Sequence, residues 1–442
     1  MRPAHKPETI NTVTEKFMGL FQQHIDHLVQ VTTAALADTH YDGLWIYSGH
    51  PENNFLDDMA PPHSINPHFK WWVPVPNVTS SVIHFVPGHK PKVYLHQPAD
   101  FWHKVVDNSQ DKWTQYFDVE VIGHYNQLPD FAAYKNHAWI GSKELQPLSA
   151  QDTNPDAIIN HLHFSRIQKT EYEVHCIAEA NQSALKGHHA AQEAFYAGAS
   201  EYEIHMAYLQ ACQHNEYQMP YGNIVALNEN PAVLHYQYQS RERVATDQLK
   251  SFLIDAGASY KGYAADITRT YAYQPGRFAE MIKMMDEKQQ MLCQKAVTGQ
   301  DYVALHELAH LSISELLCEF EVINCSAQTA VESGLSQTFF PHGLGHYLGL
   351  QVHDVSGHVI DRQGTVKSPP KAYPFLRLTD HLRENAVITI EPGVYFIPML
   401  LAEIAKHKDV NWQKVTELLP FGGIRIEDNV VVKSTVPLNL SR

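Results

Sequence analysis

The sequence predicts an α+β protein in which a smaller N-terminal α/β domain, residues 1–165, precedes a larger C-terminal domain, residues 166–442. Two observations lead to this prediction. A long amphipathic pattern and several short β-rich runs fill the first third of the chain, and a strong helix-start signal follows a stretch without periodicity. Helical patterns then give way to a strand-rich half, which is typical of helices packed on one face of an antiparallel sheet.

The first third of the chain alternates one helix with short strands. Residues 15–36 carry apolar side chains at helical spacing and predict an amphipathic helix, and residues 44–47 predict a strand. Residues 81–86 and 92–96 are β-rich runs separated by proline and glycine, which indicates a hairpin. Residues 138–140 predict one further strand.

Two capping boxes mark the start of the second domain. Periodicity is lost at 151–156, and Thr170 with Glu173 three residues later predicts the start of a long helix. Ser200 with Glu203 repeats the pattern and predicts a second helix. From residue 251 onward the sequence is rich in strand patterns.

Charge and hydropathy exclude several classes of protein. The formal net charge of −15 repels nucleic acid and anionic membrane surfaces, so neither is expected as a partner. No run approaches the roughly 18 apolar residues of a membrane span, and the first twenty residues lack a signal-peptide pattern. Five cysteines without CxxC spacing indicate free thiols in a reducing compartment. The sequence therefore predicts a cytoplasmic protein.

Two aspartates stand in β-prone surroundings, where aspartate is uncommon. Asp255 lies in SFLIDAGA, and Asp266 follows a glycine-containing turn in YAADITRTY. They are either ordinary turn and strand-end residues or a hairpin that presents two carboxylates to one metal ion. A buried unpaired carboxylate is costly, so both need a reason to be there.

Histidines gather in FFPHGLGHYLGLQVHD, where His342, His346 and His353 lie among glycines that disfavour a helix. Glu391 ends an apolar strand pattern just before Pro392, and Glu427 alternates with Ile426 along a strand, on the same face as Arg425. Each of these residues alone is compatible with a structural or solvated role.

Taken together, Asp255, Asp266, Glu391 and Glu427 would not all stay ionised in one interior without compensating cations. Two divalent ions supply that compensation. A set dominated by oxygen ligands with one imidazole, from His346, favours Mn²⁺, with Co²⁺, Zn²⁺ or Fe²⁺ as alternatives. Two such ions could share a water and lower its pKa, which is the chemistry of a hydrolase.

This ordered set resembles the pita-bread metallopeptidases, among them prolidase, aminopeptidase P and methionine aminopeptidase. The motifs that carry the resemblance are IDAGA, YAADITRT, PHGLGH, IEPG and GIRIEDN. The segments FLDDM, DFWHKV and PYGNIVALNEN, with the long insertion before Glu427, are similar to the bacterial Xaa-Pro dipeptidases of the organophosphorus acid anhydrolase type. Ser356 stands where these relatives are expected to have glycine.

The resemblance implies a creatinase-like N-terminal domain, a pita-bread catalytic domain and a homodimer. It implies that Asp266 and Glu427 bridge two metal ions, that His346 completes one and Asp255 the other, and that Glu391 both binds metal and carries a proton. By the same resemblance a further set of residues would bind the substrate or stabilise the intermediate: His235, His342, His353, Arg425, Tyr221, Asp58 and Trp102.

The implied activity is cleavage of Xaa-Pro dipeptides by a hydroxide shared between the two ions, with a side activity on organophosphorus triesters and fluoridates. One alternative is an aminopeptidase P that acts on longer Xaa-Pro peptides. Another is a pita-bread module that binds peptides without catalysis.

Overall fold

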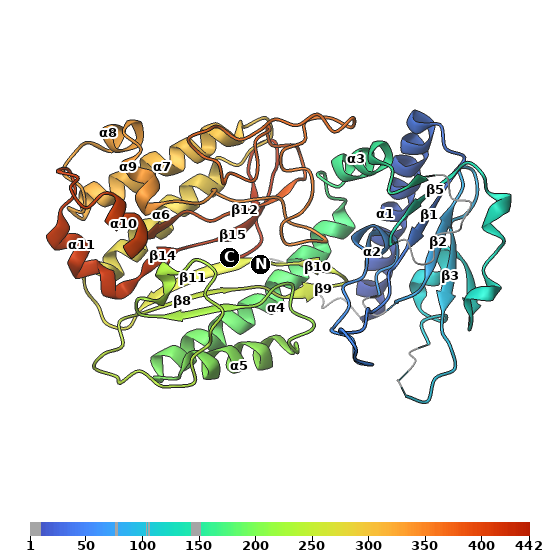
Figure 1. Cartoon of the computed structure of the whole chain (residues 1–442), viewed down its shortest axis with the longest axis horizontal. Helices are drawn as coiled ribbons and strands as arrows, with labels where there is room; N and C mark the ends of the chain where they lie inside the picture. Colours follow the sequence, from blue (N-terminus) through green and yellow to red (C-terminus); the bar gives the residue numbers. More distant parts are fainter. Residues whose placement is uncertain (1–9, 76–77, 103, 105–106, 143–151) are drawn as a thin grey trace, which may run out of the picture. The chain divides into compact units, whose positions relative to one another are not determined.

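The computed structural model describes residues 10–75, 78–102, 104, 107–142 and 152–442. The chain forms two compact units (Figure 1). Unit 1 comprises residues 1–166, 170–173 and 361–364, and unit 2 comprises residues 167–169, 174–360 and 365–442. No helix within the described ranges is long and apolar enough to cross a membrane. The five cysteines are thiols and form no disulfide within the described residues.

Unit 1 is built on a six-stranded mixed sheet in the order β4-β3-β2-β1-β5-β6. Its helices are α1 (Ile10–Thr39), α2 (Pro67–Trp72) and α3 (Asp156–Ser165), with 3₁₀ turns η1 (Lys112–Tyr116), η2 (Tyr125–Gln127) and η3 (Phe131–Ala133). Its strands are β1 (Gly43–Tyr47), β2 (Val82–Phe85), β3 (Lys92–His96), β4 (Asp118–Ile122), β5 (His137–Ile140) and β6 (Asp152–Thr153).

The long first helix, the hairpin β2–β3 and the strands at 44–47 and 138–140 confirm the elements predicted from the sequence. The sequence did not predict α2, β4 or α3. Helix α3 begins inside the stretch 151–156 that lacks periodicity, of which Gln151 lies outside the described residues.

Unit 2 contains most of the helices and four small antiparallel sheets. Its helices are α4 (Glu171–Tyr196), α5 (Glu201–Cys212), α6 (Arg277–Gln294), α7 (Tyr302–Glu319), α8 (Ala327–Glu332), α9 (Leu335–Phe339), α10 (Pro398–Glu403) and α11 (Trp412–Leu418), with η4 (Asn230–Ala232) and η5 (Leu419–Phe421). The strands are β7 (Ile224–Leu227), β8 (Ser251–Ala256), β9 (Ser259–Tyr260), β10 (Tyr263–Ala264), β11 (Ile267–Ala272), β12 (Val387–Ile390), β13 (Gly393–Tyr395), β14 (Gly423–Arg425), β15 (Asp428–Val431) and β16 (Leu438–Asn439).

Both predicted capping boxes are present. The Glu173 carboxylate accepts a hydrogen bond from the Thr170 N–H at 2.8 Å, and the Thr170 hydroxyl accepts one from the Glu173 N–H at 3.4 Å. Ser200 and Glu203 form the same reciprocal pair at the start of α5. Each box satisfies amides that a helix start leaves unpaired.

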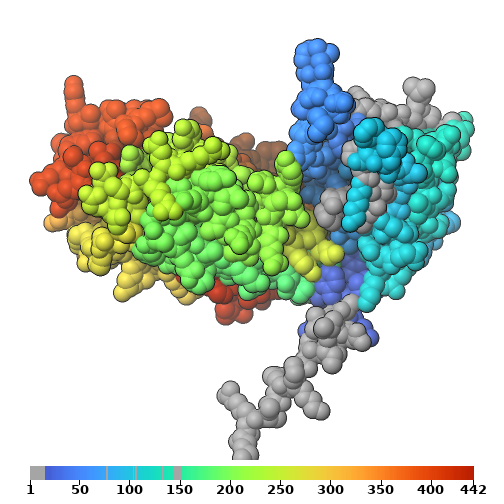
Figure 2. Space-filling model, turned by 90° about the horizontal axis from the view of Figure 1, so that it is seen from below, coloured from blue at the N-terminus to red at the C-terminus, as the bar shows by residue number. Residues whose placement is uncertain are grey.

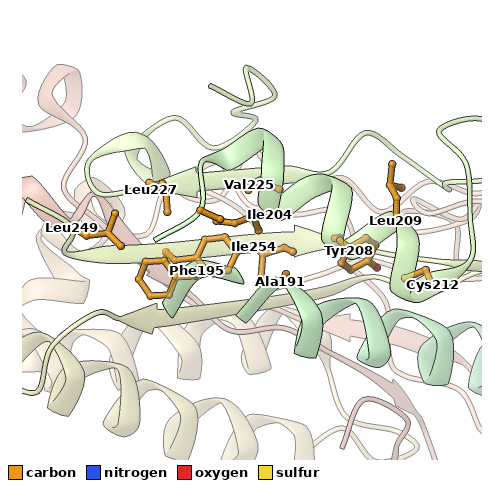
Figure 3. Close-up of a cluster of buried hydrophobic side chains, with 13 residues drawn as sticks. Ala191, Phe195, Ile204, Tyr208, Leu209, Cys212, Val225, Leu227, Leu249 and Ile254 are labelled. Atoms are coloured by element: carbon orange, nitrogen blue, oxygen red, sulfur yellow. The ribbon is translucent and has the colours of Figure 1, made fainter. Parts of the chain in front are cut away.

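Helices α4 and α5 pack on one face of the sheet β11-β8-β7 (Figure 3). Phe195 of α4 and Ile204 and Tyr208 of α5 meet Phe252 and Ile254 of β8, and all five are buried. Because side chains alternate along a strand, Asp255 points to the opposite face of β8. The second face of this sheet carries Asp255 beside a smaller apolar cluster of Ile224, Ala226 and Leu253.

A buried histidine connects α4 to β8. His188 is 3% exposed; its Nε2 donates to the Ala256 carbonyl at 3.0 Å, whereas its Nδ1 has no hydrogen-bond partner among the described residues. Burial lowers the pKa of His188 to about 3. The same side chain has a pKa near 6.5 in an unfolded chain.

This histidine makes the fold sensitive to acid. Below about pH 6.5, His188 is protonated in the unfolded chain but stays neutral in the folded chain. The free energy of unfolding therefore decreases with pH until the pH reaches the folded-state pKa of about 3. Between pH 7 and pH 5 the loss is about 2 kcal/mol for one such group. We expect His188→Gln to make the urea midpoint less dependent on pH than in the wild type. Equal pH dependence in the two proteins would contradict the expectation.

Candidate metal centre

Three residues that are far apart in the sequence form the centre of the candidate site in unit 2. Asp266, His346 and Glu427 are buried, and each offers a ligand atom within 4.8 Å of the other two. Asp255 and Glu391 border this group from either side, as the next contacts show. All five predicted metal ligands therefore lie in one region of unit 2.

The hairpin of β8 and β11 brings the two aspartates together. Thr268 pairs with Asp255 across the hairpin, and Asp266 directly precedes β11. The Tyr221 hydroxyl contacts both carboxylates, at 2.8 Å from Asp255 Oδ1 and 2.5 Å from Asp266 Oδ1. Between the strands the chain bends at Gly257, where a Cβ atom would lie 2.0 Å from the Ala265 carbonyl oxygen. The close approach requires glycine.

The glycine-rich loop holds His346 against strand β12. A Cβ atom on Gly345 would lie 2.1 Å from the Thr389 carbonyl oxygen, and Thr389 and His346 are joined by hydrogen bonds between their backbones and through the threonine hydroxyl. His346 Nδ1 donates to the Tyr347 carbonyl at 2.9 Å. This bond orients the ring, so that Nε2 is the nitrogen that faces the carboxylates.

His346 Nε2 lies between two carboxylates, 3.5 Å from Asp266 Oδ2 and 3.6 Å from Glu391 Oε1. Glu391 follows β12 directly, and its N–H donates to the Leu344 carbonyl at 2.8 Å. The strand ends there as the sequence predicts. This arrangement of one imidazole facing two carboxylates suits a cation between them.

Glu427 is placed by a different element from the one predicted. The sequence suggested one strand carrying Arg425 and Glu427 on one face, but β14 ends at Arg425 and β15 begins at Asp428. Glu427 instead forms a bridge with Thr268 of β11, whose hydroxyl donates to Glu427 Oε2 at 2.6 Å. Both faces of this segment are buried, because two sheets meet there.

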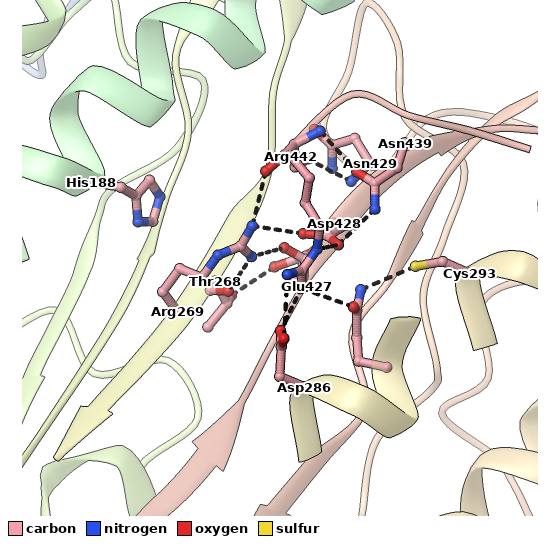
Figure 4. A network of polar contacts seen from close by, with 12 residues as sticks. His188, Thr268, Arg269, Asp286, Cys293, Glu427, Asp428, Asn429, Asn439 and Arg442 are labelled. Carbon is pink, nitrogen blue, oxygen red and sulfur yellow. Dashed lines mark hydrogen bonds and ion pairs between the residues drawn. The ribbon is translucent and has the colours of Figure 1, made fainter. Parts of the chain in front are cut away.

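A network of hydrogen bonds and ion pairs holds the backbone at Glu427 and Asp428 (Figure 4). The Arg269 guanidinium donates to the Glu427 carbonyl at 2.6 Å and to Asp428 at 2.7 Å, and Arg442 donates to the other Asp428 oxygen at 2.6 Å. Burial alone would raise the pKa of Asp428, yet Arg269 and Arg442 hold it below its usual range. Asp428 is therefore an ionised, fully paired support.

We expect Arg269→Ala to lower the free energy of unfolding by about 3 kcal/mol, because it removes one partner of a buried ion pair. The Arg269 side chain is 17% exposed and that of Asp428 is 0%. Arg243→Ala is the matched control, since Arg243 pairs with Glu203 at the surface and is 61% exposed. In urea unfolding the control should lower the free energy of unfolding far less than Arg269→Ala does, because solvent screens an exposed pair. Equal losses in both variants would contradict the role of the network.

The carboxylates do not tolerate full ionisation without added positive charge. Burial raises the pKa of Glu391 to about 7, and burial together with Asp266 raises that of Glu427 well above its usual range. Burial also raises the pKa of Asp255, against the opposing charge of Arg425. Burial acts on Asp266 in the same direction, but His346 lowers its pKa overall. Divalent cations at this site would relieve the repulsion.

Two of the other predicted histidines, His342 and His353, border this group. Each ring nitrogen of His342 has a partner at 2.8 Å, the Gly343 carbonyl for Nδ1 and the Tyr395 hydroxyl for Nε2, and Nδ1 lies 4.0 Å from Glu391. The His353 ring packs edge-on against His346 at 4.4 Å. His235 is exposed, and its charge contributes to lowering the pKa of both His342 and His353, after burial as the main cause.

Arg425 forms an ion pair within the chain. Its Nη2 donates to Asp255 Oδ2 at 2.7 Å and its Nη1 to the Tyr395 hydroxyl at 2.9 Å. Arg425 thus has an ion-pair partner within the chain, and the substrate role that the resemblance implies stays a prediction. The guanidinium also faces the site, since it opposes the raised pKa of Glu391.

Asp58 and Trp102 belong to unit 1, whereas the five candidate metal ligands belong to unit 2. Asp58 is exposed, and Trp102 is 78% exposed. Neighbouring apolar side chains are exposed as well, and in Figure 2 the blue part of unit 1 extends into a protrusion. Within the motif DFWHKV, His103 and Val105 lie outside the described residues. Ser356 has φ +72°, a left-handed conformation that favours the glycine expected there.

Three supporting residues were not predicted from the sequence. Thr389 bonds both His346 and Glu391, and Tyr395 bonds both His342 and Arg425. The Asn429 side chain accepts from the Asp266 N–H and donates to the Asp266 carbonyl, which fixes the backbone of that ligand. Thr389 could have been found from strand alternation, since it lies two residues before Glu391.

Known protein families and individual relatives match this chain over nearly its whole length. The model of metallopeptidase family M24 matches residues 175–434, and that of the Xaa-Pro dipeptidase N-terminal domain matches residues 19–164. Xaa-Pro dipeptidase 2 of Idiomarina loihiensis is 44% identical over 96% of this chain and 98% of its own length. The Xaa-Pro dipeptidase of Pseudoalteromonas translucida is 43% identical over 97% of this chain and 99% of its own.

Solved structures share the fold at lower identity. Aminopeptidase PepP of Pseudomonas aeruginosa is 20% identical, with a TM-score of 0.70 over 95% of this chain and 94% of its own. Zinc-substituted Escherichia coli aminopeptidase P in complex with product is 20% identical, with a TM-score of 0.68 over 93% of this chain and 94% of its own. At this identity the likeness concerns the fold alone.

Proposed function

Because the chain belongs to metallopeptidase family M24 and has the predicted pita-bread fold, we propose that it cleaves Xaa-Pro dipeptides with two divalent metal ions. The observation that carries the proposal is the group of four carboxylates around His346 in a buried site. Full-length relatives named Xaa-Pro dipeptidase support the substrate class.

The residues present fit two such ions. Asp255, Asp266, His346, Glu391 and Glu427 would hold them, with Asp266, His346 and Glu427 at the centre of the group. The donor set of four carboxylates and one imidazole favours Mn²⁺, with Co²⁺, Zn²⁺ or Fe²⁺ as alternatives. When bound, the ions polarise the scissile carbonyl and lower the pKa of a water molecule.

The chain's own residues then handle the proton and the substrate. Glu391, whose Oε1 lies 3.6 Å from His346 Nε2, would transfer a proton to the leaving proline nitrogen. His342 and His353 border the site and remain neutral near pH 7, because burial lowers their pKa values to about 3 and about 4. His353, together with the exposed His235, would donate hydrogen bonds to the intermediate or the substrate. His342 has a partner on each ring nitrogen and would line the pocket for the proline.

Arg425 and Tyr221 would act at the edge of the substrate. Arg425 pairs with Asp255 at 2.7 Å and would also attract a substrate carboxylate. The Tyr221 hydroxyl lies on Asp255 and Asp266 and would line the pocket.

Dipeptides and longer peptides distinguish this proposal from an aminopeptidase P. We expect kcat/KM for Ala-Pro to exceed that for Ala-Pro-Ala by at least about 10-fold, which corresponds to about 1.4 kcal/mol of transition-state binding. The relatives at 42–44% identity carry the dipeptidase name, whereas the aminopeptidase P structures are 20–21% identical. A clear preference for the tripeptide in steady-state assays would reverse the proposal.

A side activity on organophosphorus triesters and fluoridates is a further part of the proposal. The same ions would activate water against a phosphorus centre by similar chemistry. We expect kcat for Xaa-Pro dipeptides to exceed kcat for organophosphorus substrates. A higher kcat for an organophosphorus substrate would make phosphorus–ester cleavage the main activity.

We also propose a cytoplasmic homodimer in which Asp58 and Trp102 reach an active site. Both residues are exposed, and so are apolar side chains next to them in unit 1. Exposed apolar side chains of this kind support a surface that is buried when two copies of the chain associate. Sedimentation of the wild type and of Trp102→Ser would test it, since a monomeric wild type contradicts the dimer.

A further inference from the structure

Helix α7 carries a second group of histidines that the proposed function does not use. Its sequence HELAH places His306 and His310 four residues apart, on one face of the helix. Both are 1% exposed. The pattern H-E-x-x-H on a helix is one that binds zinc through its two imidazoles.

The two imidazoles line a cavity of about 280 Å³. Thr338, Tyr373 and Glu403 also border it, and His342 forms the part nearest the candidate metal centre. Such a volume holds several water molecules, so an ion with its water ligands fits. Glu403 is exposed at the edge of the cavity.

The imidazoles are held close together with free nitrogen atoms. Their ring centroids are 4.6 Å apart at an interplanar angle of 84°. His310 Nδ1 pairs with the Ser336 hydroxyl at 3.0 Å, which leaves Nε2 as the second nitrogen. His306 Nδ1 is buried and has no hydrogen-bond partner within the described part of the chain. A buried nitrogen without a partner is costly unless something binds it.

The surroundings keep both rings neutral. Burial lowers the pKa of His310 to about 4, and burial together with His310 holds the pKa of His306 well below its usual range. Tyr373 stacks on His310 and meets His306 edge-on, which restrains both rings. Neutral imidazoles in fixed orientation are the form that binds metal ions.

We propose that His306 and His310 bind a divalent transition-metal ion in this cavity, at a site separate from Asp266, His346 and Glu427. Zn²⁺ suits the site best, because it accepts two imidazoles with water molecules as the remaining ligands of a tetrahedral arrangement. Glu307, the acidic residue of the motif, is exposed. The site is therefore a binding site and not a second peptidase centre.

Zinc counting tests the proposal. The intact chain is saturated with Zn²⁺, and bound zinc is measured by equilibrium dialysis for the wild type, His306→Phe and His310→Phe. Phenylalanine keeps the ring packing against Phe340 and Tyr373 but removes the nitrogens. Each variant should bind one equivalent less than the wild type. Glu307→Gln and His189→Asn, a surface histidine whose side chain is 72% exposed, should retain the wild-type count.

Equal zinc counts in the wild type and both phenylalanine variants overturn the proposal, and so does an equal loss in His189→Asn. If a variant does not fold, zinc-edge X-ray absorption of the wild type decides the question. The mean number of imidazoles per zinc should rise as the last equivalent binds, since that ion has two imidazoles. An unchanged or falling mean overturns the proposal.

Discussion

Replacing Asp266 by asparagine is expected to lower kcat/KM for Ala-Pro by at least about 10³-fold, which is about 4 kcal/mol of lost transition-state stabilisation. Asp266 is the carboxylate that joins the others, since it contacts the Tyr221 hydroxyl and faces His346. Without its charge the site attracts two dications less strongly. Bound Mn²⁺ should fall together with activity when both are measured on the same sample.

The matched control is Asp247→Asn, which removes one carboxylate from an exposed position. Its activity and metal content should equal those of the wild type. Full activity of Asp266→Asn at ordinary Mn²⁺ concentration would rule out the proposed ligand set.

Replacing Glu391 by glutamine is expected to reduce kcat for Ala-Pro by about 10²- to 10⁴-fold, the usual contribution of a positioned proton carrier. Glutamine keeps an oxygen near His346 and preserves the volume, but it cannot accept and release a proton near neutral pH. Metal content should therefore fall less than kcat does. The comparison of kcat per bound metal ion separates the two roles of Glu391.

A kcat per bound ion that stays within about threefold of the wild type would show that Glu391 only binds metal. The Thr389→Val variant gives a useful comparison, because it removes the hydroxyl that contacts Glu391 Oε1 at 3.4 Å and leaves the carboxylate in place. It should lose far less activity than Glu391→Gln.

Local signals in the sequence predicted much of this molecule. The capping boxes at Thr170 and Ser200 specify helix starts through residues three apart, so the sequence alone identifies them. The hairpin that carries Asp255 and Asp266 has strand patterns around a short turn, and Lys261 and Gly262 adopt the positive φ values of that turn. Such features depend on neighbours along the chain.

Contacts between distant segments could not be predicted in this way. The ion pair of Arg425 with Asp255 joins residues 170 positions apart, and the bridge of Glu427 to Thr268 joins residues 159 apart. Strand alternation suggested that Arg425 and Glu427 share a strand. In the structure β14 ends at Arg425 and the next strand, β15, belongs to another sheet and begins at Asp428. The HELAH pair was visible in the sequence, although only the structure places a cavity beside it.

The proposal of two metal ions is tested most directly by titrating the metal-free chain with Mn²⁺ while bound metal and Ala-Pro hydrolysis are measured together. We predict no activity without metal, and a rate that rises until about two ions are bound per chain and then stays constant. Hydrolysis by the metal-free chain, or a maximal rate reached with one ion, would contradict the account.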